Sequence, residues 1–336
     1  MPLQSMAKII TYVTRGKIIE SVHESKCVIK DYDYKTIFTT NNDNDLVYPR
    51  SAIKIFQAIP FINSKAYKKF QLSEEQIAIS CASHYGEKEH LKILNKWINK
   101  IKINKIHLQC GIHNPLNINS SNELLLSGAK PHQLHNNCAG KHLGMISGCL
   151  TNGMSIKNYI NMNHPYQKLI RNYLEQFTET KITNKQKGVD GCSAPQYAFP
   201  LKNLSISMIN LIKHFREDMA CSDEINLLLK AIAKYPYLTG SRIKYDSQLM
   251  VATKGKIFSK WGAEGVLLFA HKEKKIGGVI KVKDGNERAI PSIANEILKK
   301  LSLINKKEAK VLSKWSNQTL LNHAKIKIGT IYTQLT

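Results

Sequence analysis

The stretch Lys8-Ile9-Ile10-Thr11-Tyr12-Val13 opens a run of short segments that alternate apolar and polar residues around Arg15-Gly16. A period of two along such segments is typical of antiparallel β-strands. The first strands are therefore predicted at residues 7–14, 17–22 and 26–31, and Ile37–Thr40 continues the sheet. The same kind of pattern returns late in the chain and predicts further strands at 248–252, 256–259, 264–270 and 276–283.

The middle of the chain instead has helical periodicity. A short helix is predicted at 51–59, and 73–80 fits a short helix or strand. Further helices are predicted at 87–103, 141–150, 165–178, 203–219 and 222–234, with a final one at about 289–302. We expect an α/β fold of the α+β type, in which N- and C-terminal strands form one mostly antiparallel sheet with helices packed on it. Residues 1–336 are predicted to form a single domain, with a helical subregion at about 87–235.

The composition excludes several classes of protein. The 336 residues are 43% hydrophobic, enough for a sizeable core, and contain no apolar run long enough to span a membrane. Met1–Ser5 lacks the features of a signal peptide, so we expect a cytoplasmic protein. The net charge is +24, but 43 of the 49 basic residues are lysines spread along the whole chain. Because nucleic-acid readers favour clustered arginine, we expect no nucleic-acid partner.

The cysteines are seven in number and scattered, which does not predict a disulfide framework. Five lie in or beside apolar stretches and are interpreted as small buried hydrophobes: Cys27, Cys81, Cys110, Cys149 and Cys221. The other two lie in turn-prone segments, His135–His142 and Gly188–Cys192, which also hold a lysine, histidines and a carboxylate. Such segments gather polar groups around small ligands.

Cys138 and Lys141 lie on one helical face if Asn137 or Cys138 starts a helix. With Cys192 they could hold Zn²⁺ through two thiolates and a neutral amine. The alternative is a pair of buried thiols with a surface lysine. His142 and His135 are alternative ligands or ordinary surface histidines. Asp190 is either a turn residue or the partner of a substrate ammonium group.

Ser51 and Lys54 are three residues apart at a predicted strand-to-helix junction. On a helix such residues are neighbours, so the amine, once neutral, can take the serine proton and create a nucleophile. Arg50 or a second lysine could be the neighbouring cation that favours the neutral amine. The alternative for Ser51 is a simple helix N-cap.

Two later segments extend this pattern. Ser83-His84-Tyr85 lies beside a glycine, and Lys260-Trp261-Gly262 is predicted at a strand edge. The order Ser-x-x-Lys, Ser-x-x, Lys-x-Gly resembles the layout of penicillin-binding proteins and serine β-lactamases. Tyr85 replaces the usual Asn and Trp261 the usual Thr or Ser, which argues against a β-lactam enzyme. His84, His90 and His113 are interpreted as mostly structural.

Together these motifs resemble a known family, the Rhizobium etli-type L-asparaginases of the asparaginase II protein family. The resemblance runs in order from about residue 8 to 330. Beyond the segments above it includes Gln109-Cys110-Gly111, His164-Pro165-x-Gln167, Gly262-Ala263-Glu264-Gly265 and Asp284-Gly285. Ala139 and Ser193 stand where the family often has Ser and Gly, two small changes beside the predicted ligands.

The resemblance implies a serine-β-lactamase-like fold, hydrolysis of L-asparagine to aspartate and ammonia, and a homodimer. It implies two Ser–Lys pairs, Ser51 with Lys54 and Ser83 with Lys260. It also implies zinc ligands at Cys138, Lys141 and Cys192, and substrate-site residues at Arg50, His142 and Asp190. On this hypothesis Ser51 attacks the substrate amide to give an acyl-enzyme, the Ser83/Lys260 pair protonates the leaving ammonia, and zinc orients the substrate. Ser83 is the rival nucleophile.

Three other functions are compatible with the residues. A glutaminase or other amidase would differ by as little as one methylene in its substrate. A non-catalytic amino-acid-binding protein would need only Asp190, Arg50 and a pocket, although the presence of both serines and both lysines argues against it. An enzyme acylated by β-lactams would be labelled on Ser51 by a penicillin probe.

Overall fold

The computed structural model describes residues 7–40, 43–216, 219 and 221–336. Two compact units can be distinguished: unit 1 comprises Met1–Ala52, Phe199–Lys213 and Gln248–Thr336, and unit 2 comprises Ile53–Ala198 and His214–Ser247. The single domain predicted over 1–336 stays a prediction. The N-terminal residues examined for a signal peptide, Met1–Ser5, lie outside the described residues, as do residues 217–218 of the helix predicted at 203–219.

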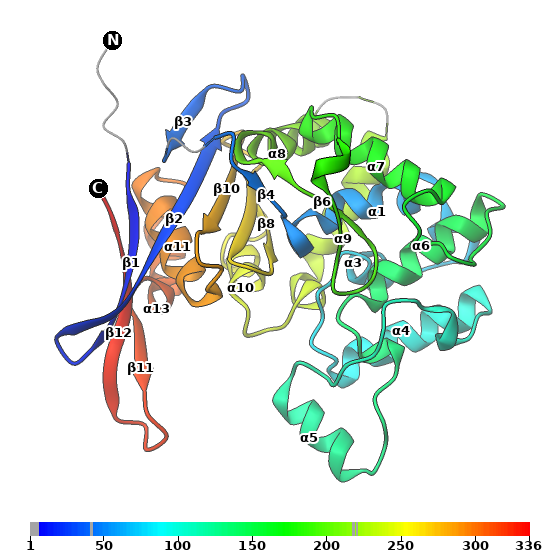
Figure 1. Cartoon of the computed structure of the whole chain (residues 1–336), viewed down its shortest axis with the longest axis horizontal. Helices are drawn as coiled ribbons and strands as arrows, with labels where there is room; N and C mark the ends of the chain where they lie inside the picture. Colours follow the sequence, from blue (N-terminus) through cyan, green and yellow to red (C-terminus); the bar gives the residue numbers. More distant parts are fainter. Residues whose placement is uncertain (1–6, 41–42, 217–218, 220) are drawn as a thin grey trace. The chain divides into compact units, whose positions relative to one another are not determined.

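Among the described residues, an eight-stranded antiparallel sheet forms the centre of unit 1 (Figure 1). Its order is β11-β12-β1-β2-β10-β9-β8, with β3 also paired to β2. The bounds are β1 (Ile9–Arg15), β2 (Ile18–Lys30), β3 (Thr36–Thr39), β8 (Ile257–Gly262), β9 (Val266–His271), β10 (Ile276–Val282), β11 (Gln318–Leu321) and β12 (Lys327–Leu335). Ile9 pairs with Leu335, so the two ends of the chain share one sheet. The predicted α/β architecture is confirmed.

Strand β2 differs from the sequence prediction, which divided it into two strands at 17–22 and 26–31. It is continuous because its first half pairs with β1 and its second half with β10. The polar residues His23 and Ser25, which interrupt the apolar pattern, are buried within it. Pairing on both sides therefore overrides the local break in alternation.

The strand predicted at 248–252 is wrong, because this segment belongs to helix α10 (Tyr245–Ala252). The amide of Thr253 donates to the carbonyl of Leu249, which is a helical hydrogen bond. A short apolar run does not by itself distinguish helix from strand. The helix predicted at 289–302 is present as α11 (Ile290–Lys300) but is not the last element, since α12 (Lys306–Val311), α13 (Ser313–Ser316), β11 and β12 follow.

Helices α8 and α11 pack against the sheet of unit 1. Helix α8 (Leu201–Arg216) approaches β10 closely, because a Cβ at Gly277 would lie 2.9 Å from Met208 Cβ. Ser205 Oγ also donates to the Gly277 carbonyl over 2.9 Å. A short pair of strands, β4 (Leu46–Val47) and β7 (Phe199–Pro200), precedes α8.

Unit 2 is mainly helical, and the predicted helices at 165–178 and 222–234 have the observed bounds. Its helices are α1 (Lys54–Asn63), α2 (Ala66–Lys69), α3 (Glu74–Ile79), α4 (Lys88–Ile101), α5 (Ile118–Leu126), α6 (Ala139–Thr151), α7 (Pro165–Thr178) and α9 (Ser222–Lys234). Nine of the ten residues of α1 are buried, and it packs against α6, α7 and α9. Helix α1 is therefore the core of the unit. A hairpin of β5 (Lys187–Val189) and β6 (Pro195–Tyr197) follows α7 in the chain.

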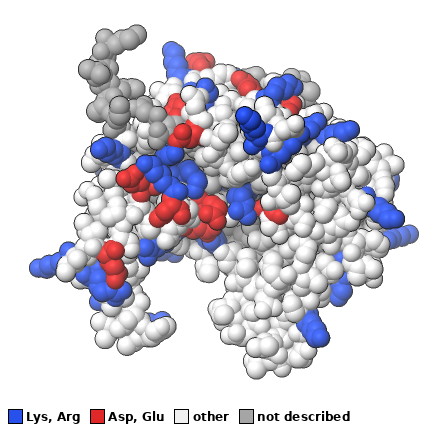
Figure 2. Space-filling model, in the orientation of Figure 1, with Lys and Arg blue, Asp and Glu red and all other residues white. Residues whose placement is uncertain are grey.

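The surface lysines do not gather in one stripe on the face shown in Figure 2. Blue side chains occur at several separate places there, and some lie next to acidic ones. Ion pairs of this kind include Arg15 with Glu20 and Lys283 with Glu24. Among the described residues, no helix has the length and apolar character needed to cross a membrane.

Candidate active site

A buried lysine and a serine hydroxyl meet in unit 2. Lys54 is the first residue of α1, and Ser83 follows the end of α3. Lys54 Nζ donates to Ser83 Oγ over 2.9 Å and also to the carbonyl of Ala82, with no exposure of the lysine to solvent. The Ser83 amide donates to the Thr239 carbonyl over 2.9 Å. A fully buried lysine is rare and needs such partners.

Helix α6 (Ala139–Thr151) begins two residues before the helix predicted at 141–150. Cys138 is its N-cap residue, so Cys138 and Lys141 both lie in the first turn. The Cys138 amide donates to Asn136 Oδ1 over 2.9 Å, and Asn136 Nδ2 donates to the Cys110 carbonyl over 2.7 Å. Gly140 lets the helix approach α3, because a Cβ there would lie 2.1 Å from the Ile79 carbonyl oxygen.

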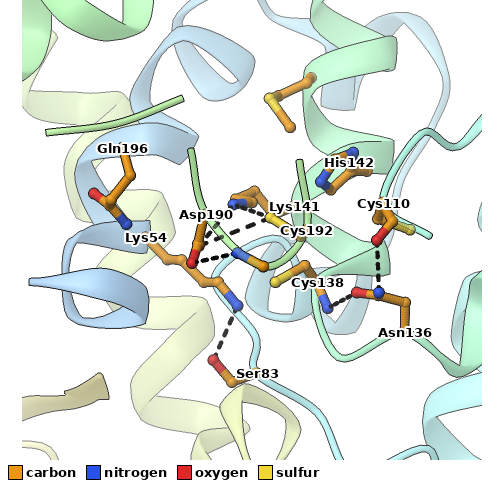
Figure 3. A network of polar contacts seen from close by, with 12 residues as sticks. Lys54, Ser83, Cys110, Asn136, Cys138, Lys141, His142, Asp190, Cys192 and Gln196 are labelled. Carbon is orange, nitrogen blue, oxygen red and sulfur yellow. Dashed lines mark hydrogen bonds and ion pairs between the residues drawn. The ribbon is translucent and has the colours of Figure 1, made fainter. Parts of the chain in front are cut away.

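The turn of the β5–β6 hairpin carries Asp190 and Cys192 to the same place (Figure 3). Lys141 Nζ donates to Cys192 Sγ over 3.0 Å and lies 4.0 Å from Asp190 Oδ2. The Gly191 amide donates to Asp190 Oδ1 over 2.9 Å, and Cys192 Sγ lies 3.8 Å from Asp190 Oδ2. Cys138, Lys141 and Cys192 are all buried. The structure therefore brings together the three predicted metal ligands and Asp190.

The charges in this cluster are strongly coupled. The hydrogen bond from Cys138 lowers the pKa of Cys192; burial opposes this, and Lys141 and His142 lower the pKa further. Burial alone would lower the pKa of Lys141, but Cys192, Cys138 and Asp190 together raise it. The same Cys138–Cys192 hydrogen bond, together with burial, raises the pKa of Cys138. The protein atoms alone thus favour a Cys192 thiolate, a Lys141 ammonium and a Cys138 thiol.

His142 is fully buried. Its Nδ1 is 2.6 Å from the hydroxyl of Tyr159, and that hydroxyl accepts from the Gln109 amide over 2.9 Å. Tyr159 is therefore the polar neighbour that orients the His142 ring. Nε2 has no hydrogen bond of good geometry among the described residues. Burial lowers the pKa of His142, and the neighbouring Cys192 partly offsets this.

The remaining predicted site residues lie in unit 1. Arg50 and Ser51 are in the 3₁₀ turn Arg50–Ile53 (η1), and Arg50 has a left-handed backbone with φ of 52°. Lys260 is buried within β8, which extends beyond the strand predicted at 256–259 and is the last strand in the sheet order. A Cβ at Gly262 would lie 2.2 Å from the Pro49 carbonyl oxygen and 3.2 Å from Ala52 Cβ. Because Lys260 and Gly262 are two residues apart on a strand, both face the turn that carries Ser51.

All seven cysteines are free, and six of them are buried, with Cys221 half-buried. His113 and His84 make hydrogen bonds inside loops: His113 Nε2 accepts from the Asn137 amide over 2.9 Å, and His84 Nδ1 from the Gly86 amide over 3.1 Å. Sequence reasoning did not identify Tyr159, because nothing local to it indicates that it orients His142. It also missed Gln196, whose side-chain amide is directed toward Lys54 in the view of Figure 3.

The fold and the clustered serine, lysine and cysteine side chains define an α/β protein with a buried polar site that has the components of an amide hydrolase. The chain belongs to the L-asparaginase II family, whose model matches residues 11–333. A search of curated proteins found no matching sequence. One similar solved structure, from Bacteroides dorei DSM 17855, is described as a "putative beta-lactamase". It is 11% identical, with a TM-score of 0.37, over 88% of this chain and 94% of that one.

Proposed function

We propose that the protein hydrolyses the side-chain amide of L-asparagine to give L-aspartate and ammonia. The observation that carries this proposal is the buried contact of Lys54 with Ser83, in a member of the L-asparaginase II family. A buried amine that meets a serine hydroxyl is the arrangement a serine amidase needs for proton transfer. A protein that only binds an amino acid has no need of it.

In the proposed reaction, Ser51 Oγ attacks the side-chain amide carbon of asparagine and its proton passes to Lys54. The carbon–nitrogen bond breaks, the nitrogen takes a proton and leaves as ammonia, and a serine ester remains. Water then adds to the ester, which releases aspartate and restores the serine. The Ser83/Lys260 pair is assigned to protonation of the leaving nitrogen, and Ser83 also accepts a hydrogen bond from Lys54. Lys54 must be neutral when it takes the serine proton.

Ser83 is the rival nucleophile, because it is the hydroxyl that Lys54 contacts. One further observation favours Ser51. A serine nucleophile often uses its own amide to hold the oxyanion, but the Ser83 amide already donates to the Thr239 carbonyl. We therefore keep Ser51 as the nucleophile and Ser83 as a proton-transfer group.

The residues Cys138, Lys141 and Cys192 fit a zinc ion. Among the described residues no group of three or more His, Cys, Asp or Glu could hold a metal, so the third ligand would be the Lys141 amine. Two buried thiols next to that amine are a donor set that zinc accepts, and binding would release the protons of Cys138 and Lys141. When bound, zinc would act as a Lewis acid that orients the substrate beside the serines.

Arg50, His142 and Asp190 are proposed to hold the substrate. The Asp190 carboxylate is suited to the α-ammonium group. We also propose a homodimer. Its support is helix α5, none of whose residues is buried and which exposes Ile118, Leu125 and Leu126. Light scattering of the purified protein, with Leu126→Asp as a variant, tests this part separately from activity.

The decisive experiment is ammonia release from L-asparagine and from L-glutamine, measured as kcat/KM with the purified protein loaded with zinc. A preference for L-asparagine supports the proposal. A preference for L-glutamine would make the protein a glutaminase on the same scaffold. Tight binding of L-asparagine without ammonia release would make it a binding protein.

A further inference from the structure

Gln196 lies on the same face of the β5–β6 hairpin as Asp190. Gly188 is opposite Gln196 in the register, Val189 is opposite Pro195, and the Asp190 amide donates to the Ala194 carbonyl over 2.9 Å. Residues 188 and 190 of one strand, and 194 and 196 of the other, therefore point to one side. The residue opposite Gln196 in the register is a glycine, Gly188.

The orientation of the Gln196 amide is fixed by a backbone group. Its Oε1 accepts from the Tyr197 amide over 3.2 Å, so the oxygen must be on that side. Nε2 is then on the opposite side, and in the view of Figure 3 it is directed toward Lys54. Gln196 is only 2% exposed, and Nε2 has no hydrogen-bond partner among the described residues.

A buried N–H donor without an acceptor is costly, and in a native protein it usually has a partner. At this position a bound substrate can supply the partner. The side-chain amide oxygen of asparagine has to meet the donors that stabilise the oxyanion near the serine. The α-carboxylate is then the substrate group that still needs a hydrogen-bond donor. It is attached to the carbon that bears the ammonium group assigned to Asp190. It therefore lies next to the ammonium group and within reach of the same hairpin face.

We propose that Gln196 is a substrate-binding residue whose Nε2 donates to the α-carboxylate of the amino-acid substrate. Asp190 and Gln196 then recognise the two charged ends of the zwitterion from one hairpin face. The inference rests on the proposed function for the identity of the substrate. It explains why a neutral donor, and not a second carboxylate, stands on the hairpin beside Asp190.

The test compares two substrates that differ by the α-carboxylate. L-asparagine has it, and 3-aminopropanamide keeps the amine and the amide but lacks it. Gln196→Glu keeps an oxygen that can accept from the Tyr197 amide but replaces the donor by a negative charge. We expect KM for L-asparagine to rise about 10- to 100-fold, with kcat within a few-fold of wild type. KM for 3-aminopropanamide should change less than about threefold, because this substrate has no α-carboxylate for Gln196 to bind.

A matched control is Gln186→Ala. Gln186 is also buried next to this hairpin, but its Nε2 already donates to the Ala198 carbonyl over 3.0 Å. This variant should lower stability without changing the ratio of the two KM values. If Gln196→Glu raises both KM values equally, or neither, the α-carboxylate contact is excluded.

Equilibrium binding separates this inference from the proposed function. Calorimetry with L-aspartate and with β-alanine, which lacks the α-carboxylate, requires no turnover. Weakened binding of L-aspartate alone in Gln196→Glu supports the contact even if wild type releases no ammonia from L-asparagine. Equal binding of L-aspartate by wild type and variant overturns it even if wild type is an active asparaginase.

Discussion

Lys54 Nζ donates to Ser83 Oγ over 2.9 Å inside the helical unit, although the sequence predicted Ser51 as the serine partner of Lys54. The contact joins the first residue of α1 to the segment after α3. It shows that Ser83 belongs to the same polar cluster as Lys54, and it makes the roles of the two serines an experimental question.

Substitution of either serine separates these roles. We expect Ser51→Ala to lower kcat for L-asparagine by at least about 10³-fold, because the nucleophile is lost. Ser83→Ala should lower kcat by about 10²–10⁴-fold through the loss of a proton-transfer group. The discriminating measurement is mass spectrometry of the acyl-enzyme after rapid acid quench. An acyl group found on Ser51 in the Ser83→Ala variant fits the proposal. An acyl group found on Ser83 in wild type would show that the two serines have the opposite roles.

Gly140 is expected to be essential for the position of the cysteine cluster. Its Cβ would lie 2.1 Å from the Ile79 carbonyl oxygen, so Gly140→Ala must separate α6 from α3. We expect a loss of about 1–3 kcal/mol in the free energy of unfolding, together with weaker metal retention. The measurements are urea unfolding and metal analysis of the purified variant.

Gly144→Ala is the matched control on the same helix. There the nearest atoms to a new Cβ, in Phe61 and Ser80, are 3.6 Å away, which is an ordinary contact. Because alanine favours a helix over glycine, this variant should be neutral or more stable by up to about 1 kcal/mol. Equal behaviour of the two variants would show that the close approach of α6 to α3 does not matter.

Much of the site could be predicted from local sequence. Cys138 does start a helix, and Asp190 and Cys192 do lie in a turn, because glycines and capping residues mark these positions within a few residues. The sequence predicts that N- and C-terminal strands share one sheet, but local patterns do not predict which strands pair. Strand β12 pairs with β1 across almost the whole chain, with Ile9 opposite Leu335, whereas the local pattern predicts no element between residues 303 and 336.

The residues that support the site were harder to predict for the same reason. Tyr159 holds His142 from a loop 17 residues away, and the role proposed for Gln196 depends on its hairpin register and on its unpaired Nε2. An isolated Tyr or Gln has no pattern that identifies it. Their roles follow from tertiary contacts, which local periodicity does not encode.

The zinc proposal predicts about one zinc ion per chain in the purified protein. Removal of zinc by a chelator should raise KM more than it lowers kcat if the metal orients the substrate. Cys192→Ala should abolish retention of zinc, because one thiolate ligand is lost. Cys149→Ala is the control, since Cys149 is a buried thiol on the same helix α6 and is not a proposed ligand. Unchanged zinc content in Cys192→Ala, measured by atomic absorption, would rule out this site.

The pH dependence of stability should reflect buried histidines. His84 is fully buried and stacked on His90, with ring centroids 5.2 Å apart. Burial, followed by His90, Lys54, His113 and His135, lowers the pKa of His84 well below 6.5. The unfolded chain therefore binds a proton at this residue before the folded chain does. Its contribution to stability is complete above about pH 6.5 and is lost progressively as the pH falls below that value.

His84→Asn tests this directly. The side-chain oxygen of the new asparagine can accept the hydrogen bond from the Gly86 amide in place of Nδ1. The asparagine side chain does not titrate. We expect the difference in unfolding free energy between pH 7.5 and pH 5.5, measured by urea titration, to be smaller in this variant than in wild type. His323→Asn is the control, because His323 is exposed and should leave the difference unchanged. If His84→Asn and His323→Asn show the same pH dependence as wild type, proton binding at His84 does not govern acid stability. The acid sensitivity would then have to come from other buried groups, such as His271, whose pKa burial also lowers.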